Sequence, residues 1–384
     1  VANSTVSGEY TIATNFDGTT SNLYVNNVLI SQTTPAIASG AKMIKIGEDY
    51  NGLIKNLKFW NYAKSFFPGG TIAFHHGTFA NSGNPYSDAS VSAAAIAFRV
   101  YSDTPAGTYS WGTLGTTSLT ADTKTTYTWT PANSLTNVDI LMIAGGGGGG
   151  GYGGGGGGGA GGLLHHTNQT LSGTKTIVVG NGGVGGLAAL GDTGKGSNGS
   201  DTELSGFTTV AGGGGGGTHS SVQHTQTERG KDGGSGGGGG HYLNAGQGYN
   251  GYGGSAVPSG QGFAGGNTGT NTGGGGGGGS GGVGFLGPNG NGGIGTDKSS
   301  IFGTIYGDSG WFASGGGGAG RLSQGNSNYG TASNGGGSDG TNDNLPTAAQ
   351  KHTGGGGGGS GEGTQNTSAI SGGHGGSGIV LIKY

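Results

Sequence analysis

Residues 144–162 read AGGGGGGGYGGGGGGGAGG, with seven glycines on each side of Tyr152. Glycine makes up 105 of the 384 residues, whereas an ordinary protein contains about 7%. This composition excludes an ordinary globular enzyme and leaves two interpretations: a flexible linker, or a packed assembly that only glycine can enter. Further glycine tracts follow at 212–217, 236–240, 273–279, 315–318 and 354–359.

Three apolar segments frame these tracts and favour the packed assembly. They are VDILMIA at 138–144, TKTIVVG at 174–180 and GIVLIKY at 378–384. Each has the length and the β-branched enrichment of a strand. We expect the last strand to pair with the first and so to close a module around the tracts, because a flexible tail has no reason to finish with a strongly apolar strand.

The tracts themselves favour polyproline-II rods. Helix and strand interiors disfavour glycine by roughly 0.5–1 kcal/mol per residue relative to alanine. A polyproline-II helix has no internal hydrogen bonds, so its backbone groups must find partners in neighbouring rods or in water. Only glycine lets such rods approach closely, and a tract of seven residues makes a rod of roughly 22 Å. Tyr152 then marks either a turn between two rods or an outward position on one longer rod.

The strands and tracts together resemble the glycine-rich (polyglycine-II) modules of phage and virus tail-fibre adhesins and related surface proteins. The matching segments are VDILMIAGGGGGGG, TIVVGNGG, TTVAGGGGGG and GGSGIVLIKY. The resemblance implies a sandwich of polyproline-II rods whose distal loops contact molecules on a host surface. Fibre proteins of this kind suggest a homotrimer by analogy.

The N-terminal region is expected to be antiparallel β structure, with strands at 9–16, 23–30, 43–46 and 53–60 and turns at Asp17-Gly18, Asn26-Asn27 and Asn51-Gly52. The segments YTIATNFDGTTSNLYVNNVLI and MIKIGEDYNGLIKNLKFWNYAKS resemble the C-terminal half of a laminin-G or concanavalin-like jelly roll. We therefore expect an all-β chain with polyproline-II rods: a partial jelly-roll sandwich at 1–65, a connecting β domain at 66–130, and the glycine module at 131–384.

Several classes of function lack support in the sequence. The chain has 15 basic and 18 acidic residues with no basic stripe, which disfavours nucleic-acid binding. It has no cysteine and no apolar run of the roughly 20 residues that a membrane span needs. The histidines show no metal-ligand spacing, and no nucleophile or carboxylate constellation can be recognised. We expect no enzyme activity, no cofactor, no metal site and no membrane insertion.

Aromatic residues gather between the glycine tracts, and these carry the functional hypothesis. Flat rings beside small polar residues suit sugar stacking or protein recognition; alternatively, they cover the outer faces of the module. We expect an extracellular adhesin on a virion or cell surface, binding a host glycan or protein and contacting other virion or fibre proteins. The alternative is a structural filament or surface-layer protein without receptor binding. The expected recognition residues are Tyr242, Tyr249, Tyr252, Phe263, Tyr306 and Trp311.

Overall fold

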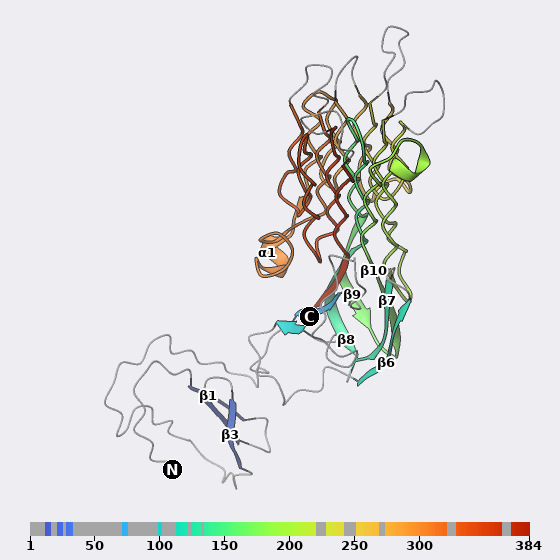
Figure 1. Cartoon of the computed structure of the whole chain (residues 1–384). Helices are drawn as coiled ribbons and strands as arrows, with labels where there is room; N and C mark the ends of the chain where they lie inside the picture. Colours follow the sequence, from blue (N-terminus) through green and yellow to red (C-terminus); the bar gives the residue numbers. More distant parts are fainter. Residues whose placement is uncertain are drawn as a thin grey trace, which may run out of the picture. The chain divides into compact units, whose positions relative to one another are not determined.

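The fold is taken from a computed structural model, which divides the chain into two compact units. One unit comprises 1–70 and 100–109, and the other comprises 71–99 and 110–384. Figure 1 follows the chain by colour. The structure describes residues 12–16, 21–25, 28–33, 71–75, 99–101, 113–120, 124–131, 134–219, 228–241, 251–268, 273–320, 328–362 and 370–384.

The described part of the first unit is a three-stranded antiparallel sheet in the order β1-β2-β3. Its strands are β1 (Ile12–Phe16), β2 (Ser21–Val25) and β3 (Val28–Thr33). Strands β2 and β3 pair from Val25 and Val28 onward, on either side of the expected Asn26-Asn27 turn. The expected strands at 43–46 and 53–60 lie outside the described residues.

The second unit begins with two antiparallel sheets whose strands come from distant parts of the chain. One has the order β11-β10-β7-β6 and the other β5-β4-β14-β8-β9. The four-stranded sheet contains β6 (Thr113–Thr120), β7 (Lys124–Thr130), β10 (Lys175–Gly180) and β11 (Glu203–Leu204). The five-stranded sheet contains β4 (Thr71–His75), β5 (Arg99–Tyr101), β8 (Leu135–Ile143), β9 (Leu163–Leu171) and β14 (Ile379–Lys383).

The expected pairing of the first and last framing strands is confirmed. β14 lies between β4 and β8, with Leu381 opposite Leu141 on β8 and opposite Ala73 on β4. β7 likewise pairs with β10. Strands on both sides of the expected domain boundary at residue 131 are therefore hydrogen-bonded to one another.

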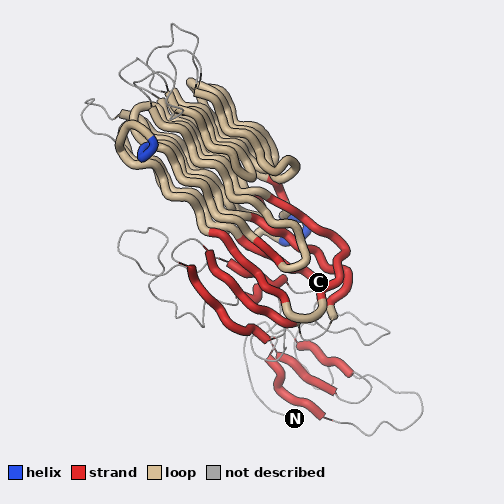
Figure 2. Tube along the Cα trace, turned by 90° about the vertical axis from the view of Figure 1, so that its right-hand side faces the viewer, coloured by secondary structure: helices blue, strands red, loops and turns tan. Residues whose placement is uncertain are grey.

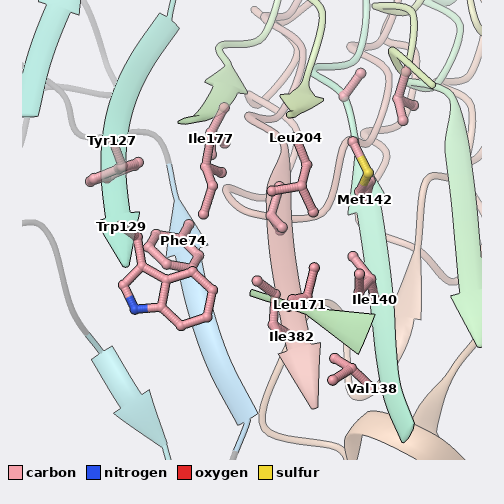
Figure 3. Close-up of a cluster of buried hydrophobic side chains, with 14 residues drawn as sticks. Phe74, Tyr127, Trp129, Val138, Ile140, Met142, Leu171, Ile177, Leu204 and Ile382 are labelled. Carbon is pink, nitrogen blue, oxygen red and sulfur yellow. The ribbon is translucent and has the colours of Figure 1, made fainter. Parts of the chain in front are cut away.

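A hydrophobic core joins the two sheets (Figure 3). Tyr127 and Trp129 alternate with more exposed residues along β7, as expected for a strand with one buried face. Both aromatic rings pack on Phe74, with centroids 5.4 and 5.8 Å away. The same core contains Ile140 of β8 and Ile382 of β14.

A second core covers the other face of the five-stranded sheet. It joins Leu141 and Leu381 to Phe302 of the short helix α1 (Ser299–Phe302) and to Phe312. Because residues 140–143 of β8 and 379–382 of β14 are buried on both faces, these stretches are continuous apolar runs rather than alternating ones. The remaining short elements are the 3₁₀ helix η1 (Asp192–Gly194) and the paired strands β12 (Thr296–Asp297) and β13 (Trp311–Phe312).

Beyond the sheets, extended segments that are neither strand nor helix lie side by side (Figure 2). We call these segments rods. In the rod 144–151 the hydrogen-bond partners repeat every three residues. The N–H groups of residues 145, 148 and 151 donate to one rod (194–200), those of 146 and 149 to a second (370–376), and those of 147 and 150 to a third (155–162).

The rod 155–162 is the centre of this lattice. Its backbone N–H groups donate to three rods, and its carbonyl groups accept from three others. Each of these neighbours is one of the glycine tracts of the sequence, and consecutive members of the ring they form are also hydrogen-bonded to each other. In order around the centre, the ring consists of rods 144–151, 211–217, 235–241, 273–279, 313–320 and 354–361.

The rods outside this ring have mixed sequences. An example is 181–187, whose N–H groups at Gly183 and Gly186 donate to carbonyls of the ring rod 144–151. On one side of the ring rod 211–217, side chains take the place of a neighbouring rod. The side-chain oxygens of Asn198 and Asp201 accept hydrogen bonds from the N–H groups of Gly215 and Gly212. These buried backbone donors therefore need no further rod as a partner.

At the glycine positions inside the lattice the rods are too close-packed for a side chain. A Cβ atom added to Gly157 of the central rod would lie 2.0 Å from the carbonyl oxygen of Gly316, and one at Gly147 would lie 2.2 Å from that of Gly214. Tyr152 is the turn between the first two rods, with φ of 59°, followed by Gly153 and Gly154 at 62° and 93°. The two glycines adopt a conformation that side chains disfavour.

Candidate recognition surfaces

Many of the described segments begin or end at the same end of the glycine module, the end away from the sheets (Figure 1). We call this the distal end. Hydrogen bonds hold these ends together: Gly240 donates to the Glu228 carbonyl, Thr268 to Gly251, and Tyr152 to Ile370. The expected recognition residues Tyr242 and Tyr249 lie outside the described residues. Their described chain neighbours, His241 and Gly251, belong to this end.

A buried aromatic layer closes the lattice beneath these chain ends. The rings of His219 and His241 stack with centroids 5.6 Å apart and planes 24° apart, and Tyr152 lies 5.7 Å from His219. Both histidines are buried, as is Glu362 nearby. The sequence does not predict this group, because the two histidines are far apart in the chain. The available signal was their position, since each follows a glycine tract within two residues.

Two of the expected recognition residues lie on the side of the module. Tyr252 and Phe263 are 59% and 44% exposed, on the neighbouring rods 251–257 and 261–268. These rods are joined by the hydrogen bond from Gly265 to Gly254. The two rings are therefore accessible on outer rods: Tyr252 directly follows Gly251 at the distal end, whereas Phe263 lies further along its rod.

The other two described residues lie near the helix α1. Tyr306 is only 4% exposed and belongs to the core with Phe302 and Phe312. Trp311 is half-buried and sits in β13 opposite Asp297. The four described members of the expected set thus do not form one site, and Tyr306 has no accessible ring.

Aliphatic side chains on outer rods were also missed by the sequence analysis. Val184 and Leu187 on one rod, and Val283 and Leu286 on another, are all more than half exposed. Phe285, between the last two, is 59% exposed. A monomer rarely exposes grouped apolar side chains without a reason, so both rods are candidate contact surfaces.

Burial shifts the pKa of several side chains in the module. It lowers the pKa of His166 and His374 below the usual value. The pKa of His165 is lowered by burial and by the nearby Lys298, although Asp139 lies 3.8 Å away and opposes the shift. Lys195 and Lys231 also have lowered pKa values because of burial.

Two features are absent from the described part of the chain. Among the described residues, no group of three or more histidines and carboxylates is placed to hold a metal ion. In the same part of the chain, no helix is long and apolar enough to cross a membrane.

Residues 120–384 match the model of a family described as the glycine-rich domain. The matched region includes β7, the framing strands β8, β10 and β14, and all of the rods. No curated protein matches the chain.

Proposed function

The chain belongs to the glycine-rich domain family, and we propose that it is a non-enzymatic adhesin of a phage, virus or cell surface. In this proposal the glycine module is a rigid scaffold, and the segments at its distal end recognise a glycan or a protein on a host surface. The protein acts outside the cell or on the virion, beside other fibre or virion proteins.

We also propose that the rods are polyglycine-II helices. The three-residue repeat of hydrogen-bond partners along 144–151 supports this, because polyproline-II geometry has three residues per turn. The absence of hydrogen bonds within that rod and the central position of 155–162 among other rods support it as well.

One observation carries the adhesin proposal: chain ends from distant parts of the sequence meet at one end of a hydrogen-bonded lattice. A scaffold of this kind fixes the positions of these described residues before a ligand binds. Less conformational entropy is then lost on binding, and more of the contact energy is available as affinity.

The test replaces residues 242–252 with glycine and serine in the full chain. We expect the unaltered protein to bind host cells or envelope polysaccharide, and the variant to lose that binding while keeping its thermal melt. The matched control replaces residues 257–259 with the same residue types. These residues lie at the end of the rod 251–257 that is away from the distal end.

Equal binding by the two variants would contradict the proposal for this segment. If the protein does not bind cells but forms regular filaments, the alternative is favoured: a structural filament or surface-layer protein.

For the first 65 residues we propose a partial laminin-G or concanavalin-like sandwich. The hairpins β1-β2 and β2-β3 are compatible with it. A structure of the first unit determined by experiment would test this proposal, and a sheet order that does not occur in jelly rolls would overturn it.

A further inference from the structure

Two outer rods carry apolar side chains that face solvent. Ridge A is formed by Val184 and Leu187 on the rod 181–187 and by Leu190 in the bend that follows it, and these side chains are 55%, 58% and 46% exposed. Ridge B is formed by Val283, Phe285 and Leu286, which are 54%, 59% and 57% exposed. Phe263 and Ile294, on the rods next to ridge B, are also exposed.

The two ridges lie on opposite sides of the module. Ridge A borders the rod 144–151, and ridge B borders the rod 273–279. Two rods separate these on either side of the ring around 155–162: 211–217 and 235–241 on one side, 313–320 and 354–361 on the other. The rods under the two ridges are thus opposite members of the ring.

The ridges also lie at the same height along the rods. A series of backbone hydrogen bonds connects the two ridges across the module. From one bond to the next, the path shifts along the intervening rod by no more than one residue. Phe285 and Gly186 therefore lie at the same height along the rod axis to within about two residues, roughly 6 Å. The path runs from Gly186 to Gly149, from Gly150 to Gly156, from Gly157 to Gly275, and from Gly276 to Phe285.

Neither ridge carries charge. Residues 176–191 and 233–296 contain no Asp, Glu, Lys or Arg. Ridge A of one copy can therefore meet ridge B of another without burying an unpaired charge, which would be costly. The aliphatic side chains favour a protein surface over a sugar, because they leave sugar hydroxyl groups without hydrogen-bond partners.

The contact area indicates a weak interaction. Six side chains that are about half exposed bury on the order of 600 Å² in total when the two ridges meet. Stable complexes bury about 1,200–2,000 Å², and contacts below that range belong to weak, transient association.

From the opposite placement, the matched height and the lack of charge, we propose that copies of this protein associate side by side through ridge A of one copy and ridge B of the next. The contact joins two different surfaces that lie on opposite sides of one body. Such a contact produces open rows rather than closed rings.

Because the two ridges lie at the same height, a row can form by translation alone, and in such a row all distal ends point the same way. If the distal end binds a receptor as proposed above, a row presents many binding sites at once and gains avidity. The association itself does not depend on that proposed function, and it is measured without any receptor.

The experiment measures the association of the full chain by sedimentation velocity from about 1 µM to about 1 mM, a range that covers weak binding. We expect an open series of dimers, trimers and larger species that grows with concentration. Leu187→Glu disrupts ridge A, and Phe285→Glu disrupts ridge B. Each variant alone should stay monomeric, whereas an equal mixture should form dimers and stop there, since each partner keeps one intact ridge.

Leu345→Glu is the matched control, because Leu345 is 67% exposed and belongs to neither ridge. It should associate as the unaltered protein does. All variants alter exposed side chains, and thermal melts check that they fold. A monomeric unaltered protein at every concentration, a closed trimer without larger species, or an unchanged series in either ridge variant would overturn the proposal.

Discussion

Gly157→Ala, in the central rod 155–162, tests whether the glycine tracts are a packed lattice. A Cβ atom at Gly157 would lie 2.0 Å from the carbonyl oxygen of Gly316. An ordinary C···O contact is about 3.3 Å, so the two rods must separate by about 1.3 Å. The rod 313–320 cannot simply yield, because hydrogen bonds of 2.9 Å hold Gly316 to Gly158 and Ala319 to Gly155.

The cost follows from these contacts. Overpacking costs about 1–3 kcal/mol, and each buried backbone group that loses its partner costs about 1–3 kcal/mol. Strain of about 1–3 kcal/mol and two weakened bonds of about 1–3 kcal/mol each together destabilise the module by about 3–9 kcal/mol, a large part of a typical stability of about 5–15 kcal/mol. Alanine also restricts the unfolded chain, but that gain is only about 0.4–1 kcal/mol.

Thermal unfolding of the full chain measures the effect. After the gain from the restricted unfolded chain is subtracted, a net loss of at least about 2 kcal/mol should lower the melting temperature of Gly157→Ala by at least about 4 °C. The control is Gly282→Ala, where the nearest atom to the new methyl group is Cγ2 of Ile294 at 3.3 Å and the backbone is not in the left-handed region. That variant should melt within about 4 °C of the unaltered protein. If Gly157→Ala melts no lower than Gly282→Ala, the tracts are not close-packed and the reasoning fails.

Three further predictions concern the module. Asn198→Ala removes the acceptor for the buried N–H of Gly215 and the donor to the Asp232 carbonyl, and it should lower the free energy of unfolding in urea by about 1–3 kcal/mol; Asn198→Asp loses only the donor and should lose less, and equal losses would contradict the role of the acceptor. Since burial lowers the pKa of His166 and His374 in the folded state, the unfolded chain binds more protons below its histidine pKa of about 6.5, so the free energy of unfolding should fall as the pH drops from 7 to 5. His374→Asn should flatten that profile, and a stability that is constant or rises on acidification would refute the assignment. Deleting residues 378–384 removes β14 from between β4 and β8 and should abolish cooperative unfolding in calorimetry; a truncated chain with an unchanged transition would show that the framing strands do not close the module.

Much of the module could be predicted from the sequence because its signals are local. The apolar runs at 138–144 and 378–384 predicted two paired strands, and β8 and β14 confirm the pairing. The family match confirms a glycine-rich module. The turn at Tyr152, one of two alternatives considered, is the one observed.

The candidate site was harder to predict because accessibility depends on which rod a residue occupies. Phe263 and Tyr306 both lie between glycine tracts, yet Phe263 is 44% exposed on an outer rod and Tyr306 is buried against α1. No local pattern near Tyr306 in the sequence predicts its packing against α1 or its place in one core with residues of β8 and β14.

A signal that separates inner from outer rods does exist, and it follows from the three-residue repeat. A rod surrounded on all sides has no direction free for a side chain, so it needs uninterrupted glycine, as in 155–159. In a rod at the surface, every third residue faces solvent, and at these positions glycine can be replaced by a residue with a side chain. Residues 182–187 read GGVGGL, and Val184 and Leu187 are the exposed positions. The interruptions of the glycine pattern, rather than the glycine tracts, therefore identify the side chains that a partner can reach.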